Sequence, residues 1–164
     1  MEKPLGEMTA DERWTLRNSN TQRNYWRLEM LNWIPPQNIR AEQVVLGNMM
    51  QNALCACNVR SLLSEEDFYR EAHRNIYRAI VHLVEHSEDA NLLSVTFYLC
   101  SEHKLESVGG LEYLTKLGHE FYSEPRFWAC ARIVSDKAKQ RRNEVLLLEI
   151  RSLLEDILKE VGNG

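Results

Sequence analysis

Apolar residues recur every three to four positions through most of the chain after Asn38, which is the spacing of one face of an α-helix. No segment shows the strict alternation of apolar and polar residues that is typical of a half-buried strand. The pattern predicts helices over about 39–50, 53–63, 68–86, 91–99 and 111–117. The expected fold class is all-α: a globule of five to six helices followed by one long helix.

Polar and turn-forming residues mark the boundaries of these predicted helices. Ser64-Glu-Glu-Asp67 has the form of a capping box before the third helix. The inward face of that helix is expected to include Ile76, Ala79 and Leu83. Gly109-Gly110 is expected to interrupt the helical pattern, because glycine adopts backbone angles that other residues avoid.

The last predicted helix is much longer than the others. Ser123-Glu-Pro125 is a favourable start, and neither Pro nor Gly follows before Gly162. Two neighbouring rows of apolar residues occupy its second half: Leu146, Ile150, Leu153, Ile157 and Val161 in one row, and Leu147, Leu154, Leu158 and Val161 in the other. A small domain cannot cover both rows, so they predict a partner helix or a partner subunit.

The chain divides into three parts by composition. Residues 1–34 form an aromatic-rich extension, residues 35–122 the helical globule, and residues 123–164 the long helix that would serve oligomerisation. The extension either packs on its own domain or docks on a partner, for which Trp and Tyr are favoured contact residues. The residues that would dock are Trp14, Tyr25, Trp26 and Trp33.

The charge balance argues against a protein whose main task is to grip nucleic acid. The chain has 20 Lys and Arg and 24 Asp and Glu, which gives a formal net charge of −4. Proteins that bind the nucleic-acid backbone are usually strongly basic. One basic run lies early in the long helix and is either a solvated face or a weak contact for phosphate or an acidic partner. It consists of Arg132, Lys137, Lys139, Arg141 and Arg142.

Few residues of the chain point to catalysis or to a cofactor. It contains no Gly-x-x-x-x-Gly-Lys-Ser/Thr phosphate loop and no evident grouping of nucleophile, base and orienting residue. The candidate metal ligands are Cys55 and Cys57, Cys100 with His103, and the pair His82/His86. Such residues are more commonly buried thiols and solvated histidines than ligands. We therefore expect a chain that is not an enzyme by itself and has no metal or cofactor.

The sequence also bears on location in the cell. No apolar run approaches the length of a membrane span, and the first residues lack the apolar core of a signal peptide. We expect a cytoplasmic protein with reduced cysteines and no contact with a membrane.

Four segments resemble, in order and with similar gaps, the N-terminal domain of bacterial DnaB-type replicative helicases. They are PPQNIRAEQVVLGNMM from Pro35, EDFYREAHRNIYRAI from Glu66, VGGLEYLTKL from Val108 and CARIVSDKAKQRR from Cys130. The resemblance covers about residues 35–160. Two positions depart from the family pattern: Arg40 replaces a usual acidic residue, and Asn91 replaces a usual Asp, which puts a local cap or a partner surface in question.

The resemblance implies a fold and a set of partners. In that family a helical globule precedes a long helical hairpin, and Leu146 to Val161 would lie on the first arm of the hairpin. Domains pair through these hairpins as dimers or as a trimer of dimers, and the resulting collar binds primase and, in some systems, the helicase loader. DNA would be contacted only indirectly, and the expected location is the replisome.

Three functions follow as alternatives. The chain is the collar domain of a replicative helicase, cut from a longer protein or encoded alone. As a second alternative, it is a stand-alone regulator or inhibitor that binds a full-length replicative helicase or its primase. The third alternative, a small helical DNA-binding protein, should bind duplex DNA with a steep dependence on salt.

Overall fold

The computed structural model describes residues 34–119 and 122–162, with the side chains of 155, 156 and 159–162 left aside. This part of the chain contains six α-helices, two short 3-10 helices and no strand, so the predicted all-α class is confirmed. The helices are α3 (Ile39–Met49), α4 (Ala53–Val59), α5 (Glu71–Glu85), α6 (Leu92–Ser101), α7 (Gly110–His119) and α8 (Glu124–Gly162); the 3-10 helices are η2 (Glu65–Asp67) and η3 (Glu106–Val108).

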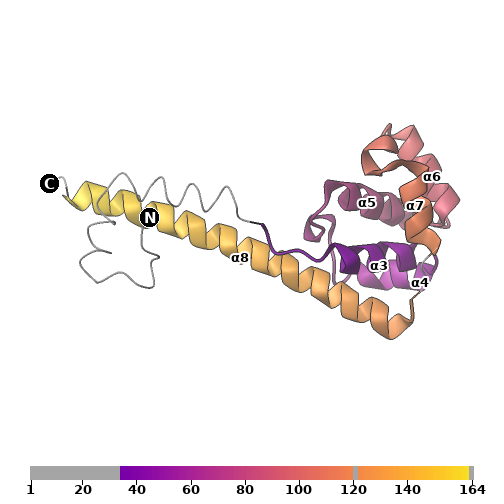
Figure 1. Cartoon of the computed structure of the whole chain (residues 1–164), viewed down its shortest axis with the longest axis horizontal. Helices are drawn as coiled ribbons and strands as arrows, with labels where there is room; N and C mark the ends of the chain where they lie inside the picture. Colours follow the sequence, from indigo (N-terminus) through magenta and orange to yellow (C-terminus); the bar gives the residue numbers. More distant parts are fainter. Residues whose placement is uncertain (1–33, 120–121, 163–164) are drawn as a thin grey trace, which may run out of the picture. The chain divides into compact units, whose positions relative to one another are not determined.

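Helix α3 lies at the centre of the globule and packs against α4, α5, α7 and the first half of α8 (Figure 1). The 3.6-residue spacing places Ala41, Val44, Val45 and Met49 on one face of α3, and all four are buried. The core around it is closed by large side chains that are fully inaccessible, among them Phe68, Ile80 and Phe127. One hydrophobic core therefore holds elements that are distant in sequence.

Asparagine side chains cap the starts of α3, α4 and α6. Asn38 accepts a hydrogen bond from the Ala41 amide, and Asn52 accepts one from the Leu54 amide. Asn91 accepts from the next amides in the same way, at the start of α6. An Asn at this position therefore performs the capping role expected of the usual Asp.

Two predicted boundaries are wrong, and tertiary contacts explain the second. The predicted helix 53–63 ends at Val59, and the helix predicted from Phe68 begins at Glu71. The Ser64–Asp67 capping box is present but caps η2, and Phe68 is extended, with φ −80° and ψ 136°. The Tyr69 amide donates to the buried Glu42 carboxylate at 2.9 Å, so this bond holds the segment out of a helix.

A buried polar network joins α3, α5 and α7. Glu42 and His73 are 2% and 0% exposed, and the Nδ1–H of His73 donates to Glu42 Oε2 at 2.6 Å. His73 Nε2 lies 2.6 Å from the Tyr113 hydroxyl, which also accepts from Gln43 at 3.1 Å. Because each of these groups is partnered, the network can be buried without leaving a charge unsatisfied.

The glycine pair before α7 is required by backbone geometry. Gly109 and Gly110 have φ of 102° and 70°, in the region where side chains are disfavoured. A Cβ atom on Gly109 would lie 2.9 Å from the Tyr113 Cβ. The pair therefore turns the chain tightly enough for Tyr113 to reach His73.

Candidate protein interaction surface on the long helix

Helix α8 has two halves with different surroundings. In the first half, Phe127, Ala131, Val134 and Ala138 are buried against the globule. The second half extends beyond the globule (Figure 1). Six of its predicted contact residues have exposed fractions between 45% and 70%: Leu146, Ile150, Leu153, Leu154, Ile157 and Leu158. We call these six residues the α8 seam; the Val161 side chain lies outside what the structure describes.

The α8 seam lies on a different side of the helix from the residues that face the globule. An α-helix turns about 100° per residue. Ile150 follows Ala138 by twelve residues and therefore lies about 120° around the axis from it, and Leu154 lies about 160° away by the same count. A partner that covers the α8 seam therefore approaches from a side that the chain's own globule leaves open.

Sequence spacing alone missed two exposed apolar residues beside the α8 seam. Val145 and Leu148 are 47% and 37% exposed and fall outside the rows. The signal was the run Val145-Leu146-Leu147-Leu148, because four consecutive apolar residues cover every side of a helix. The exposed apolar surface is therefore wider at this point than a simple two-row seam.

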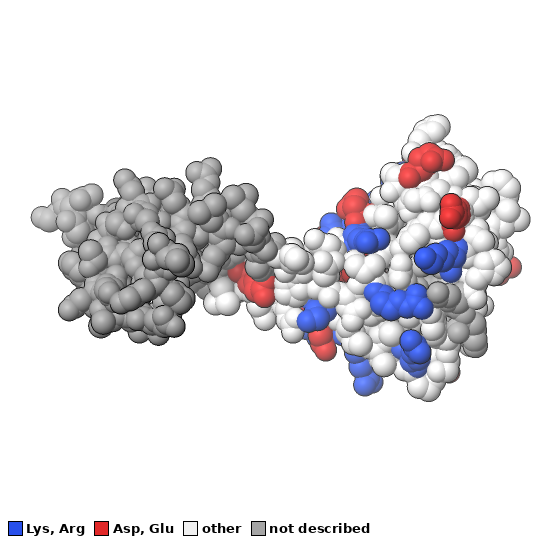
Figure 2. All heavy atoms as spheres, in the orientation of Figure 1, with Lys and Arg blue, Asp and Glu red and all other residues white. Residues whose placement is uncertain are grey.

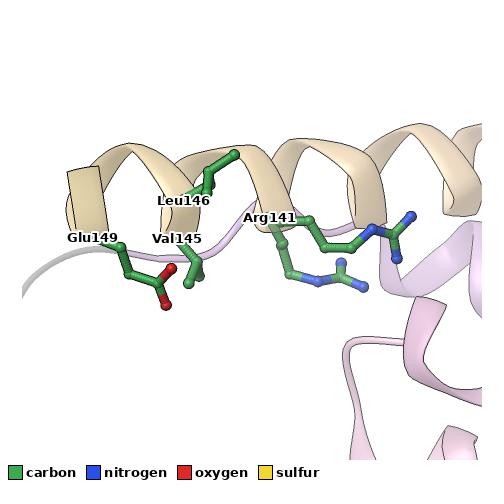
Figure 3. A pocket seen from close by; sticks show the side chains of 5 residues that line it. Arg141, Val145, Leu146 and Glu149 are labelled. Atoms are coloured by element: carbon green, nitrogen blue, oxygen red, sulfur yellow. The ribbon is translucent and has the colours of Figure 1, made fainter.

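Two arginines fix α8 to the globule where its surroundings change. Arg141 donates to the carbonyl oxygens of Pro36 at 2.8 Å and Asp67 at 2.5 Å, and burial lowers its pKa. Arg142 donates to the Asp67 carboxylate at 2.7 Å. The same two arginines, with Val145, Leu146 and Glu149, line a shallow hollow (Figure 3). This Arg–Asp clamp joins α8 to the globule at the point where the exposed half begins.

The predicted phosphate contact is therefore only partly available on the surface. Arg141 and Arg142 already bind groups of their own chain. Arg132 and Lys139 are exposed, and Lys139 lies 3.7 Å from Asp136. Figure 2 shows Lys and Arg over α3 and the first half of α8, with Asp and Glu both toward the end that carries α6 and along α8. Phosphate binding by Arg132, Lys137 and Lys139 stays a prediction.

The remaining candidate ligands do not form a metal centre in the described part of the chain. No group of three or more His, Cys, Asp or Glu there could hold a metal ion. Cys55 is buried and Cys130 half-buried, and burial raises the pKa of both thiols. The rings of His82 and His86 lie 4.1 Å apart without a third ligand.

Two further predictions concern features outside this surface. The aromatic residues Trp14, Tyr25, Trp26 and Trp33 lie outside the described residues. Among the helices that are described, none has the length and apolar character needed to cross a membrane.

The described part of the chain is thus an all-α domain with a protruding helix whose apolar side chains are exposed, and such exposed patches are typical of interaction sites. The sequence model of the DnaB-like helicase N-terminal domain matches residues 34–136. The chain belongs to this family.

Relatives with known structures or names agree with this assignment. The crystal structure of the N-terminal domain of DnaB helicase from Mycobacterium tuberculosis matches with a TM-score of 0.69 and 34% identity, over 73% of this chain and 86% of that one. Replicative DNA helicase DnaB from Geobacillus stearothermophilus is 37% identical over 109 residues, and the protein of that name from Rhodothermus marinus is 36% identical over 115.

The matches cover only part of the relatives. The aligned segment spans 66% of this chain but 24% of the Geobacillus helicase and, at 70% of this chain, 12% of the Rhodothermus one. The similarity therefore concerns one domain of a much longer protein.

Proposed function

We propose that this chain is a non-catalytic collar domain of a DnaB-type replicative helicase and acts in DNA replication. It pairs with a second copy through the α8 seam, and the assembled domains dock primase or a helicase loader. The observation that carries the proposal is the α8 seam itself, in a chain that belongs to this family.

The energy available from the α8 seam supports pairing. Burying a Leu or Ile side chain that was exposed contributes about 1.5–3 kcal/mol, and less in proportion when half of it is already covered. Six half-exposed side chains per copy, together with Val145 and Leu148, are a larger apolar surface than isolated exposed residues provide. A second copy supplies the same surface, so two seams can cover each other.

Charge along α8 favours an antiparallel arrangement of the two copies. The run from Arg132 to Arg142 carries five basic residues and one acidic residue, whereas residues 144–160 carry five acidic residues and two basic ones. In an antiparallel pair, the basic part of one helix lies beside the acidic part of the other, and a parallel pair would place like charges together.

Substitution within the α8 seam tests the pairing. We expect Leu153→Glu combined with Ile157→Glu to convert an oligomer to a monomer in analytical ultracentrifugation, because two charges would be buried at the contact. Leu54→Glu on α4, where the native side chain is 71% exposed, is the matched control and should leave the oligomer intact. An unchanged oligomer in the double variant, with native helix content by circular dichroism, would refute pairing through α8.

Partner docking requires a separate measurement. Purified primase and a purified helicase loader should each be titrated against the native chain and the Leu153/Ile157 double variant by calorimetry. We expect at least one of the two proteins to bind the native chain. If the docking surface spans two copies, binding should be weaker in the double variant, which cannot pair. If the native chain binds neither primase nor the loader, the docking part of the proposal is refuted and the pairing part is unaffected.

A further inference from the structure

Helix α6 has an outward apolar face that is separate from the α8 seam. Its sequence, LLSVTFYLCS, is apolar on nearly all sides. Val95 and Leu99 face the core and are fully buried, whereas Leu93 and Phe97 are 64% and 65% exposed. Helices that are apolar all round are normally covered on every side. The outward face of α6, formed by Leu93 and Phe97, therefore lacks the cover that its composition calls for.

This outward face is firmly held in place. Asn91 caps the helix through the amides of Leu93 and Ser94, and the Thr96 hydroxyl donates to the Leu92 carbonyl at 2.7 Å. The opposite side of α6 packs on α5 and α7. Leu93 and Phe97 are four residues apart and so lie one turn apart on the same side of the helix. They present a rigid pair of anchors to a partner, which lowers the ordering cost of binding.

The chain segment that contains α6 carries mostly negative charges. Residues 85–112 contain six Asp and Glu and a single basic residue, Lys104. Lys104 lies 3.6 Å from Glu102, and Glu85 pairs with Arg60. Glu88, Asp89, Glu106 and Glu112 form no ion pair among the described residues. Acidic side chains thus precede and follow the exposed pair along the chain.

This combination selects the chemistry of the partner. The acidic residues that precede and follow α6 repel nucleic acid and anionic lipid, and they attract cations. Two apolar anchors one helical turn apart fit the apolar face of another helix. We propose that the outward face of α6 is a docking surface for a cationic amphipathic helix of a partner protein. Because the outward face of α6 contains no residue of the α8 seam, this surface acts independently of the pairing proposed above.

A peptide probe tests the surface directly. A fluorescein-labelled 14-residue helix of Leu and Lys, with Leu on one face, is titrated against the full chain by anisotropy at low salt. We expect binding that weakens at least tenfold in Leu93→Gln combined with Phe97→Gln, and severalfold when Glu88→Gln is combined with Asp89→Asn. The matched control, Leu153→Gln combined with Ile157→Gln on α8, should change the affinity less than twofold.

Exposed thiols of the chain give a second readout. Cys100 follows Phe97 by three residues and is exposed on the same side of α6, whereas Cys57 is exposed on α4. The bound peptide should slow alkylation of Cys100 severalfold and leave the rate at Cys57 unchanged.

Three results would overturn the proposal. One is equal binding by the α6 double variant. Another is equal binding of a peptide in which Glu replaces every Lys, because the acidic residues that precede and follow α6 must select against it. The third is loss of self-association in the α6 double variant, which would assign this face to a second copy instead.

Discussion

Removing His73 from the buried network is the most informative change to the fold. The ring is fully inaccessible, and the Glu42 carboxylate beside it is 2% exposed. In His73→Leu, Glu42 keeps the Tyr69 amide but loses its bond to Nδ1, and the Tyr113 hydroxyl loses the bond to Nε2. The substitution therefore removes one of the hydrogen-bond donors to a buried carboxylate.

The expected magnitude follows from the pairing. Breaking a buried ion pair or charged hydrogen bond by removing one partner costs about 3–5 kcal/mol, mostly because the other group stays buried. Replacing both partners by apolar residues is often nearly neutral. We therefore expect His73→Leu to lose about 3–5 kcal/mol of unfolding free energy, and Glu42→Leu combined with His73→Leu to lose clearly less than the sum of the single changes.

Urea unfolding followed by circular dichroism at 222 nm measures this, at one fixed protein concentration because self-association adds to apparent stability. With a slope of about 1–3 kcal/mol per molar urea, the midpoint should fall by one molar or more. His86→Gln changes an exposed histidine at the C-cap of the same helix and should stay within about 0.5 kcal/mol of the native chain. A loss below 1 kcal/mol for His73→Leu, or strict additivity in the double variant, would refute the reasoning.

The remaining predictions concern a titrating group, a glycine and a cap. Burial raises the pKa of Tyr77 to about 12, so its contribution to the unfolding free energy is present below pH 10 and is lost as pH rises through 12. Tyr77→Phe should therefore flatten the fall in urea midpoint between pH 10 and 11.5. The same change should cost about 1 kcal/mol at pH 7, because the Leu63 carbonyl loses its hydrogen-bond donor. Gly109→Ala should lower the thermal midpoint more than Gly110→Ala, because both have positive φ but only the first meets a neighbouring atom. Asn91→Ala should cost about 1 kcal/mol in urea unfolding, whereas Asn91→Asp should be tolerated, and equal losses would argue against the cap.

Membership of the helicase family and the exposed apolar helix are connected. Residues 34–136 match the family model, and the α8 seam begins just after them at Leu146. The globule supplies a base for α8, and the Arg–Asp clamp at Asp67 joins the helix to it where the exposed half begins. In our proposal the clamp fixes α8 to the globule at the base of the half that pairs.

Local sequence determined the class and the approximate positions of the helices. The 3.6-residue spacing predicted the class of the fold, and the start of α3 and the long run of α8 from Ser123 were found without tertiary information. The inward residues Val44, Val45 and Met49 followed from the same spacing. These features depend on interactions within a few residues of one another, which a sequence pattern records directly.

Tertiary structure decided the features that join distant residues. The extended segment before α5 exists because a carboxylate 27 residues away takes the Tyr69 amide. The use of Arg141 and Arg142 inside the chain depends on Asp67, more than 70 residues earlier. The sequence predicted that α8 carries excess apolar surface, but only packing of the globule shows which side of the helix stays open, because burial depends on neighbours that local spacing does not record.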